Sequence, residues 1–164
     1  MLSHRNLFRM GTQGLTAVTG KWAEDFSARI QNAGLSCHVL PKDTWKIAML
    51  EKHIWICAFM AVGAKYKGIT VGEVESTKTS EVRELIEQLG NAASKATGIN
   101  FPEGLADRLC SYAKSVSHFP TALKEFEWRN GYFTGLTLEA VSKLQPDPCP
   151  AHTEIMISEG LYKP

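Results

Sequence analysis

Residues 43–63 read DTWKIAMLEKHIWICAFMAVG, and this stretch decides the fold. Every residue from Ile54 to Val62 is apolar, so a helix formed here has no face left for water. We expect one long helix, with Asp43 or Thr44 as its N-cap and Gly63 at its end. Its second half must be wrapped by other elements, so the stretch predicts the centre of a protein core.

Three polar residues, Glu51, Lys52 and His53, interrupt the stretch. A membrane-spanning helix needs about twenty apolar residues, so we do not expect one here. Lys52 shares a helical face with three apolar residues that follow it, Ile56, Phe59 and Met60. Desolvation beside them would lower the pKa of Lys52, which makes it a candidate proton donor or anion binder. In the alternative, the stem of Lys52 packs while its ammonium reaches water.

Length and charge limit the classes of protein to consider. A chain of 164 residues can bury one sizeable core, and its formal net charge of +1 gives no field that would gather nucleic acid or an anionic membrane. We expect neither partner. The four cysteines show no C-x-x-C pairing, which indicates reduced thiols in an intracellular protein. The basic, acid-free first ten residues leave a cytoplasmic and an organellar location open.

Helical periodicity dominates the rest of the chain. We expect an arm or loop over residues 1–19 and one helical domain over residues 20–164, with about six or seven helices in an all-α fold. The segment Leu35–Leu40 is expected to be extended but alone, and a lone strand does not make a sheet. Besides the central one, the expected helices start near Lys21, Ser80, Pro102, Thr121 and Pro150. A short helical turn near Val71–Glu75 stays open, and Leu136–Leu144 either continues the helix from Thr121 or restarts after Gly135. The first helix is indicated by a stripe of Trp22, Phe26, Ile30 and Ala33, and the second is expected to have Ser80 as its N-cap and Gly98 at its end.

Chemical motifs are few. No G-x-G-x-x-G follows a strand and no G-x-x-x-x-G-K-[ST] occurs, so the sequence predicts no dinucleotide or nucleotide site. No metal-ligand spacing occurs either, and we expect no metal. One dense cluster remains, KEFEWRNGY at residues 124–132. On a helix its Glu125, Trp128, Arg129 and Tyr132 would share a face, either covered by a partner or ligand or formed by an Arg–Glu pair over packed rings.

Two stretches give the chain a family resemblance. LEKHIWICAFMA at residues 50–61 resembles the W-E-K-L-x-x-N-x-x-x-N pattern of ketopantoate reductase-like proteins, and KEFEWRNGY resembles their T-E-I-D-x-x-N-G pattern. The match is to the C-terminal helical domain of that family, which is 6-phosphogluconate dehydrogenase C-terminal-like. Residues 14–34 resemble the segment that leads from the cofactor domain into the helical one.

The resemblance implies site residues. Lys52 corresponds to the lysine that protonates the forming alcohol while hydride arrives from NADPH, and Glu125 corresponds to the carboxylate that holds the substrate hydroxyl. Asn130 falls in the same motif and is implied as substrate-binding. Ile56 and Met60 stand where the family has two substrate-binding asparagines, and apolar side chains cannot make those hydrogen bonds. Ketopantoate itself is therefore not the expected substrate.

Hydride transfer needs a bound nicotinamide, and we expect no cofactor site in this chain because it carries no Rossmann motif. Two functions remain open. The first is the helical, substrate-binding domain of a ketopantoate reductase-like oxidoreductase, inactive alone and acting on a small 2-keto acid. The second is a non-enzymatic binding or oligomerisation module that keeps the fold. Since a reductase domain without its cofactor half exposes an apolar patch, we expect a homodimer or a complex with a separate cofactor-binding chain.

Overall fold

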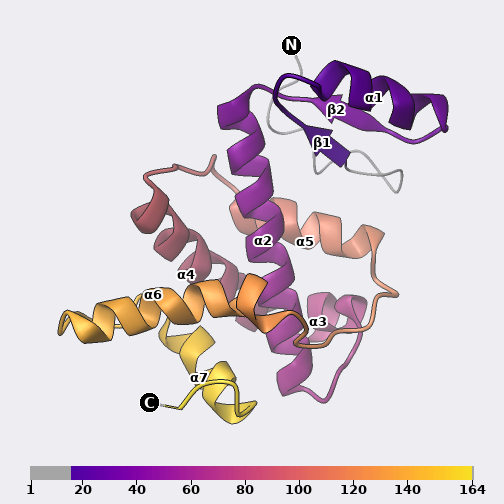
Figure 1. The fold of residues 1–164 in the computed structure, drawn as a ribbon. Helices are drawn as coiled ribbons and strands as arrows, with labels where there is room; N and C mark the ends of the chain where they lie inside the picture. The colour runs from indigo at the N-terminus through magenta and orange to yellow at the C-terminus, as the bar shows by residue number, and fades with distance from the viewer. Residues whose placement is uncertain (1–15, 164) are drawn as a thin grey trace.

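The computed structural model describes residues 16–163, and within that part the chain is mostly helical (Figure 1). This confirms the expected all-α domain, while the closer likeness to the 6-phosphogluconate dehydrogenase C-terminal-like fold stays a prediction. The helices are α1 (Ala23–Asn32), α2 (Lys42–Lys65), α3 (Val71–Thr77), α4 (Thr79–Thr97), α5 (Leu105–Ser115), η2 (Phe126–Trp128, a 3-10 helix), α6 (Asn130–Ser142) and α7 (Pro150–Ser158). Two short strands, β1 (Thr16–Val18) and β2 (Cys37–Val39), complete it.

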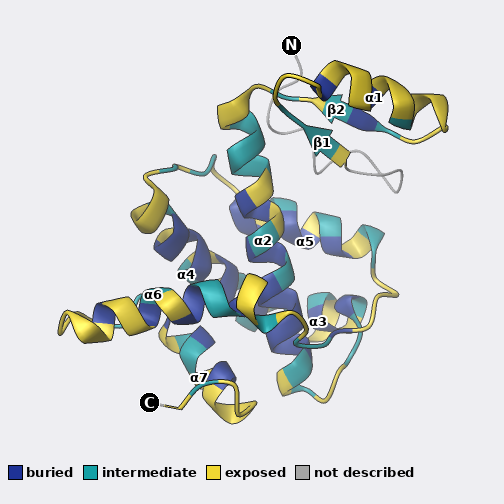
Figure 2. Cartoon of the chain, viewed as in Figure 1, coloured by how far each residue is buried: buried dark blue, intermediate teal, exposed yellow. Residues whose placement is uncertain are grey.

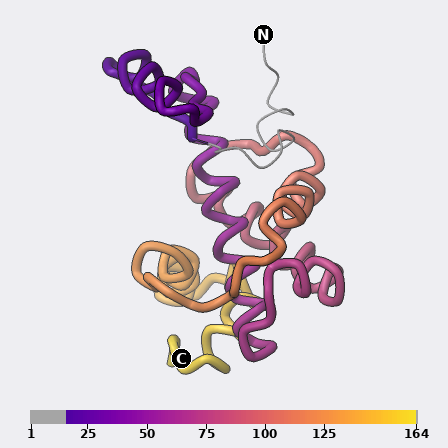
Figure 3. The backbone as a smooth tube through the Cα atoms, turned by 90° about the vertical axis from the view of Figure 1, so that its right-hand side faces the viewer, coloured from indigo at the N-terminus to yellow at the C-terminus, as the bar shows by residue number. Residues whose placement is uncertain are grey.

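Helix α2 is the axis of the domain. α3, α4, α5 and α7 all pack against it, and Figure 1 and Figure 3 show it running through the middle of the helical body. In its second half Ile54, Phe59 and Val62 are 0% exposed, and Figure 2 shows the same half as a buried band. Burying each such side chain contributes about 1.5–3 kcal/mol. The predicted core helix is confirmed.

The ends of α2 differ from the expectation. Pro41 occupies the N-cap position and no side chain caps the helix, so neither Asp43 nor Thr44 has the predicted role. Gly63 does not end the helix, which continues to Lys65. A Cβ on Gly63 would collide with Thr121, so this glycine serves a close approach between α2 and the segment before η2.

By length and composition α2 could cross a membrane, but 61% of its most apolar window is buried inside the protein. Core helices of soluble proteins meet the same criteria. The apolar length of α2 is therefore weak evidence for a membrane span.

Local signals predicted other helix ends with mixed success. Gly98 closes α4 in the left-handed conformation, as its sequence position indicated. Ser80 is not the N-cap of α4, because Lys78 takes that place. Thr70 forms a capping box with Glu73 at the start of α3, where the two side chains satisfy each other's backbone N–H groups.

A small β–α–β unit precedes the helical body, which corrects the expectation of a lone extended segment. β1 lies in the predicted arm, of which residues 1–15 fall outside the described residues, and it pairs in parallel with β2 (Thr16 with Cys37, Val18 with Val39). Trp45 Nε1 donates to the Ala17 carbonyl at 3.1 Å and ties β1 to the start of α2. Figure 1 and Figure 3 both show the unit at that end of α2, away from α3, α6 and α7.

The apolar stripe of α1 does not face this unit. Ala23 and Ser27 are the buried residues of the helix, whereas Trp22 is 67% exposed and Phe26 is 48% exposed. The spacing of the apolar residues identified the helix correctly. In the described chain, however, Trp22 and Phe26, which begin this stripe, remain largely exposed.

Candidate functional site

Lys52 projects from α2 into an aromatic setting. Its Nζ donates to the Tyr112 hydroxyl on α5 at 2.7 Å. The same Nζ lies 4.1 Å from the centre of the Trp55 ring and 4.2 Å from that of Tyr112. These two ring faces attract the ammonium, and they also take part of its hydration away.

The protonation of Lys52 responds to this setting. Partial desolvation, and after it the positive charge of Arg129, lower the pKa of Lys52 from 10.5 to about 8. Lys52 as a residue nevertheless remains exposed, so only the part of its ammonium that lies against the two rings loses contact with water. The side chain can therefore gain or lose a proton near physiological pH while solutes can still reach it.

Glu125 lies outside any helix, which corrects the expected helical face over residues 121–132. Its φ of 50° and ψ of 45° place it in the left-handed region just before η2. For a non-glycine residue this costs about 1–2 kcal/mol, and such strain is concentrated at functional sites. Trp128, which the helical pattern placed beside Glu125, points to solvent and is 80% exposed.

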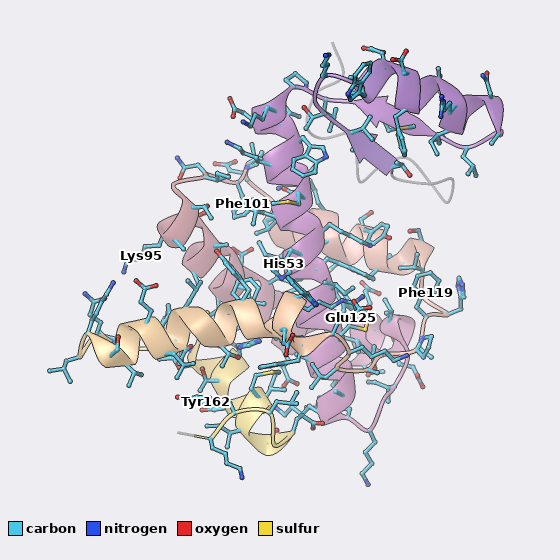
Figure 4. The ribbon with its side chains drawn as sticks, viewed as in Figure 1. His53, Lys95, Phe101, Phe119, Glu125 and Tyr162 are labelled. Carbon is cyan, nitrogen blue, oxygen red and sulfur yellow. The ribbon has the colours of Figure 1, made fainter. Side chains whose placement is uncertain are left out.

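Arg129 links this turn to α2. Its Nη2 lies 2.7 Å from Glu125 Oε2, and its side chain is 27% exposed. Its charge acts on Lys52, and His53 Nε2 donates to its backbone carbonyl at 3.1 Å. Figure 4 shows His53 and Glu125 at the crossing of α2 with the segment that precedes α6. Arg129 thus interacts with both predicted site residues, through an ion pair with Glu125 and through its charge with Lys52.

The surroundings of His53 favour its neutral form. Desolvation is the main reason that its pKa falls below the ordinary 6.5. Its ring lies 5.4 Å from that of Tyr132 and 5.5 Å from that of Phe133, so it fixes the start of α6 against α2. Sequence reasoning did not single it out, although it directly follows Lys52.

A buried ion pair links α2 to α5 next to Lys52 in the sequence. Arg108 Nη2 lies 2.5 Å from Glu51 Oε1, and their side chains are only 11% and 5% exposed. Arg108 also donates to the backbone carbonyls of Glu103 at 2.5 Å and Pro102 at 3.1 Å. These bonds fix α5, and with it Tyr112, relative to α2.

Asn130 has a different place. It is 1% exposed, and its Oδ1 accepts a hydrogen bond from His152 Nε2 of α7 at 2.9 Å. With its amide oxygen engaged in the core, Asn130 joins α6 to α7. Its implied contact with substrate stays a prediction, and we leave it out of the site proposed below.

The positions of the two family asparagines are occupied by core side chains. Ile56 is half-buried against the core, and Met60 is 7% exposed. Neither can donate or accept a hydrogen bond. Among residues 16–163 no group of three histidine, cysteine, aspartate or glutamate side chains could hold a metal ion, and the four cysteines are free and buried.

His152 makes stability depend on pH. It is 0% exposed, and desolvation lowers its pKa from 6.5 to about 4, with Asp147 opposing the shift. As pH falls from 6.5 to about 4, His152 binds a proton in the unfolded chain but stays neutral in the folded chain. The free energy of unfolding should therefore drop over this window, by up to about 3 kcal/mol.

Urea unfolding at both ends of that window measures the drop. His152→Gln, which can still donate to Asn130, should remove most of it, whereas the exposed His118→Gln should leave it unchanged. An unaltered pH dependence in His152→Gln would show that another group is responsible.

The sequence matches no model of a known protein family and none of the curated proteins with which it was compared. The resemblance to ketopantoate reductase-like proteins therefore depends on the two motifs quoted above. Membership of that family stays a proposal.

Proposed function

We propose that this chain is the substrate-binding, helical domain of a ketopantoate reductase-like oxidoreductase that acts on a small 2-keto acid. The observation that carries the proposal is the position of Lys52, whose ammonium lies against both the Trp55 and Tyr112 rings and is affected by the charge of Arg129. Two cationic groups whose charges interact suit an anionic substrate, and the lowered pKa of one of them suits proton transfer.

Each residue has a role in this proposal. Arg129 binds the carboxylate of the acid, because a guanidinium offers a planar pair of donors that matches it. Glu125 orients Arg129 through their 2.7 Å contact and can accept a substrate hydroxyl. Lys52 gives its proton to the carbonyl oxygen as that oxygen becomes an alcohol, and Tyr112 holds the lysine in position.

The described residues do not fit a dinucleotide. The turn between β1 and α1, VTGKW at residues 18–22, lacks the glycine pattern that lets a helix start approach a pyrophosphate. We therefore derive no hydride step within this chain. A hydride donor would have to be held by another domain or chain.

The β–α–β unit supports such a partner. Parallel sheets are normally covered on both faces and continue over several strands, yet within residues 16–163 this sheet consists of β1 and β2 alone. Around them Leu35 is 57% exposed, Val39 37% and Trp22 67%. We propose that a separate cofactor-binding α/β chain, or alternatively a second copy of this chain, covers this surface.

One finding favours the second candidate function, a non-enzymatic binding or oligomerisation module. Ile56 and Met60 are packed as core residues, so the hydrogen bonds of the family asparagines are not available. A binding or oligomerisation module would use the exposed surface of the β–α–β unit and would not need the charged site. The two functions therefore differ in whether the chain binds a 2-keto acid.

Isothermal titration calorimetry with a panel of 2-keto acids tests the proposal. The wild-type chain should bind at least one of them. Arg129→Gln should weaken that binding about tenfold or more, because a hydrogen bond between charged groups contributes roughly 1.5–3 kcal/mol. Lys52→Met should weaken it as well. Lys46→Met, which removes a half-exposed lysine of the same helix, is the matched control.

A chain that binds none of the acids, or variants that bind as tightly as the wild type, would reject the enzymatic proposal in favour of the module.

A further inference from the structure

Lys52 differs from the lysines of the chain that form ion pairs. Lys46, Lys65, Lys114 and Lys143 each lie 3.7 Å or less from a carboxylate oxygen. Among the residues that the structure describes, Lys52 makes no such ion pair. Its Nζ contacts the Tyr112 hydroxyl and two ring faces instead. No ion-pair partner among the described residues therefore stabilises the protonated form of Lys52.

A lysine in this environment is a nucleophile as well as an acid. An amine that is partly desolvated and lies near a second cation loses its proton at lower pH, which frees the nitrogen lone pair. With a pKa of about 8, roughly a fifth of Lys52 is unprotonated at about pH 7.4, against about 0.1% for an ordinary lysine.

We infer that Lys52 forms a reversible imine with the carbonyl carbon of a 2-oxo acid whose carboxylate is bound by Arg129. This inference rests on the site of the proposed function and gives Lys52 a second reaction there, separate from proton donation, because a carbonyl oxygen that leaves as water does not become an alcohol. The step needs no cofactor and no oxidant or reductant, so the chain can perform it without a partner.

The bonds balance as in any amine condensation. The Nζ lone pair attacks the carbonyl carbon, the carbonyl oxygen takes up a proton, and the resulting carbinolamine loses that oxygen as water to leave a carbon–nitrogen double bond. The Tyr112 hydroxyl lies 2.7 Å from Nζ, and burial raises its pKa, so it stays protonated. It is placed to carry a proton between the nitrogen and the departing oxygen.

Reductive trapping tests the inference. The full chain is incubated with pyruvate and sodium cyanoborohydride, which converts an imine into a stable secondary amine, and the modified peptide is identified by mass spectrometry. We expect modification of Lys52 at least tenfold faster than of any other lysine. Trapping should accelerate as the pH rises through about 8.

Variants separate the inference from general lysine chemistry. Lys52→Arg keeps the charge but cannot form an imine, so the dominant adduct should disappear, and Lys46→Arg should leave it unchanged. Arg129→Gln should slow trapping of pyruvate about tenfold and leave trapping of the uncharged propanal unaffected. Far-ultraviolet circular dichroism confirms that each variant is folded.

The outcome is distinct from that of the proposed function. If calorimetry shows binding of a 2-keto acid that depends on Arg129, but trapping is absent or spread over surface lysines, the imine is rejected and the proposed function stands. If Lys52 is trapped equally fast by pyruvate and propanal in wild type and Arg129→Gln, the lysine is reactive but the assigned carboxylate site is wrong, and the inference as stated falls.

Discussion

Glu51→Ala should lower the free energy of unfolding by about 3–5 kcal/mol, because it leaves the Arg108 guanidinium buried without its counter-charge. The pair is 2.5 Å apart, and the two side chains are 5% and 11% exposed. Arg108 keeps its bonds to two backbone carbonyls, which cannot neutralise its charge. Urea unfolding measured by circular dichroism gives the difference.

Two further variants make this result specific. Asp43→Ala removes an acid from the same helix whose side chain is 94% exposed and pairs with Lys46 at 3.7 Å, so it should change stability by less than about 1 kcal/mol. The double variant Glu51→Leu and Arg108→Met replaces both charges with apolar groups and should recover much of the loss. A loss below about 1 kcal/mol in Glu51→Ala would show that the pair is not buried in solution.

Gly63→Ala should also destabilise the fold strongly, by about 2–4 kcal/mol, as overpacking in a tight core does. The added Cβ would meet the Thr121 side chain, with Cγ2 at 2.5 Å. Thr121 cannot easily move away, because its hydroxyl donates to the Ile69 carbonyl. The thermal unfolding midpoint measures the effect.

Gly135→Ala is the matched control. Gly135 lies inside α6 with no atom within 4 Å of an added Cβ. There alanine should stabilise the helix by about 0.5–1 kcal/mol. Thr121→Gly should restore much of the stability of Gly63→Ala. If Gly63→Ala is as stable as the wild type, the close approach of α2 to Thr121 is wrong.

The core could be predicted from the sequence because it depends on local patterns. The apolar run from Ile54 to Val62 identified the central helix, and Gly98 identified the end of α4. The parallel pairing of Thr16–Val18 with Cys37–Val39 could not be predicted, since it joins segments that lie far apart in the chain. The exposure of Trp22 and Phe26 depends on which side of α1 has a partner, and the spacing of apolar residues does not encode that.

The candidate site, too, could be predicted from the sequence only in part. Lys52 was identified because it interrupts an apolar face. Tyr112, its closest polar contact, is 60 residues away and looked like any other core residue of its helix. Glu125 was expected on a helical face, but its left-handed backbone conformation ends any helical pattern before η2. The same turn contacts α2 through the hydrogen bond from His53 to the Arg129 carbonyl, which joins segments far apart in the chain and is not encoded by a local pattern.

The central claim is that Lys52, Tyr112 and Arg129 form one site for a 2-keto acid. Nuclear magnetic resonance of the tryptophan indole N–H groups tests it most directly, because the Trp55 ring centre lies 4.1 Å from Lys52 Nζ while Trp22 lies in the β–α–β unit. Titration with a 2-keto acid should shift the Trp55 signal in a saturable way and leave that of Trp22 unchanged. An unchanged Trp55 signal, or a shift at Trp22 alone, would contradict the account.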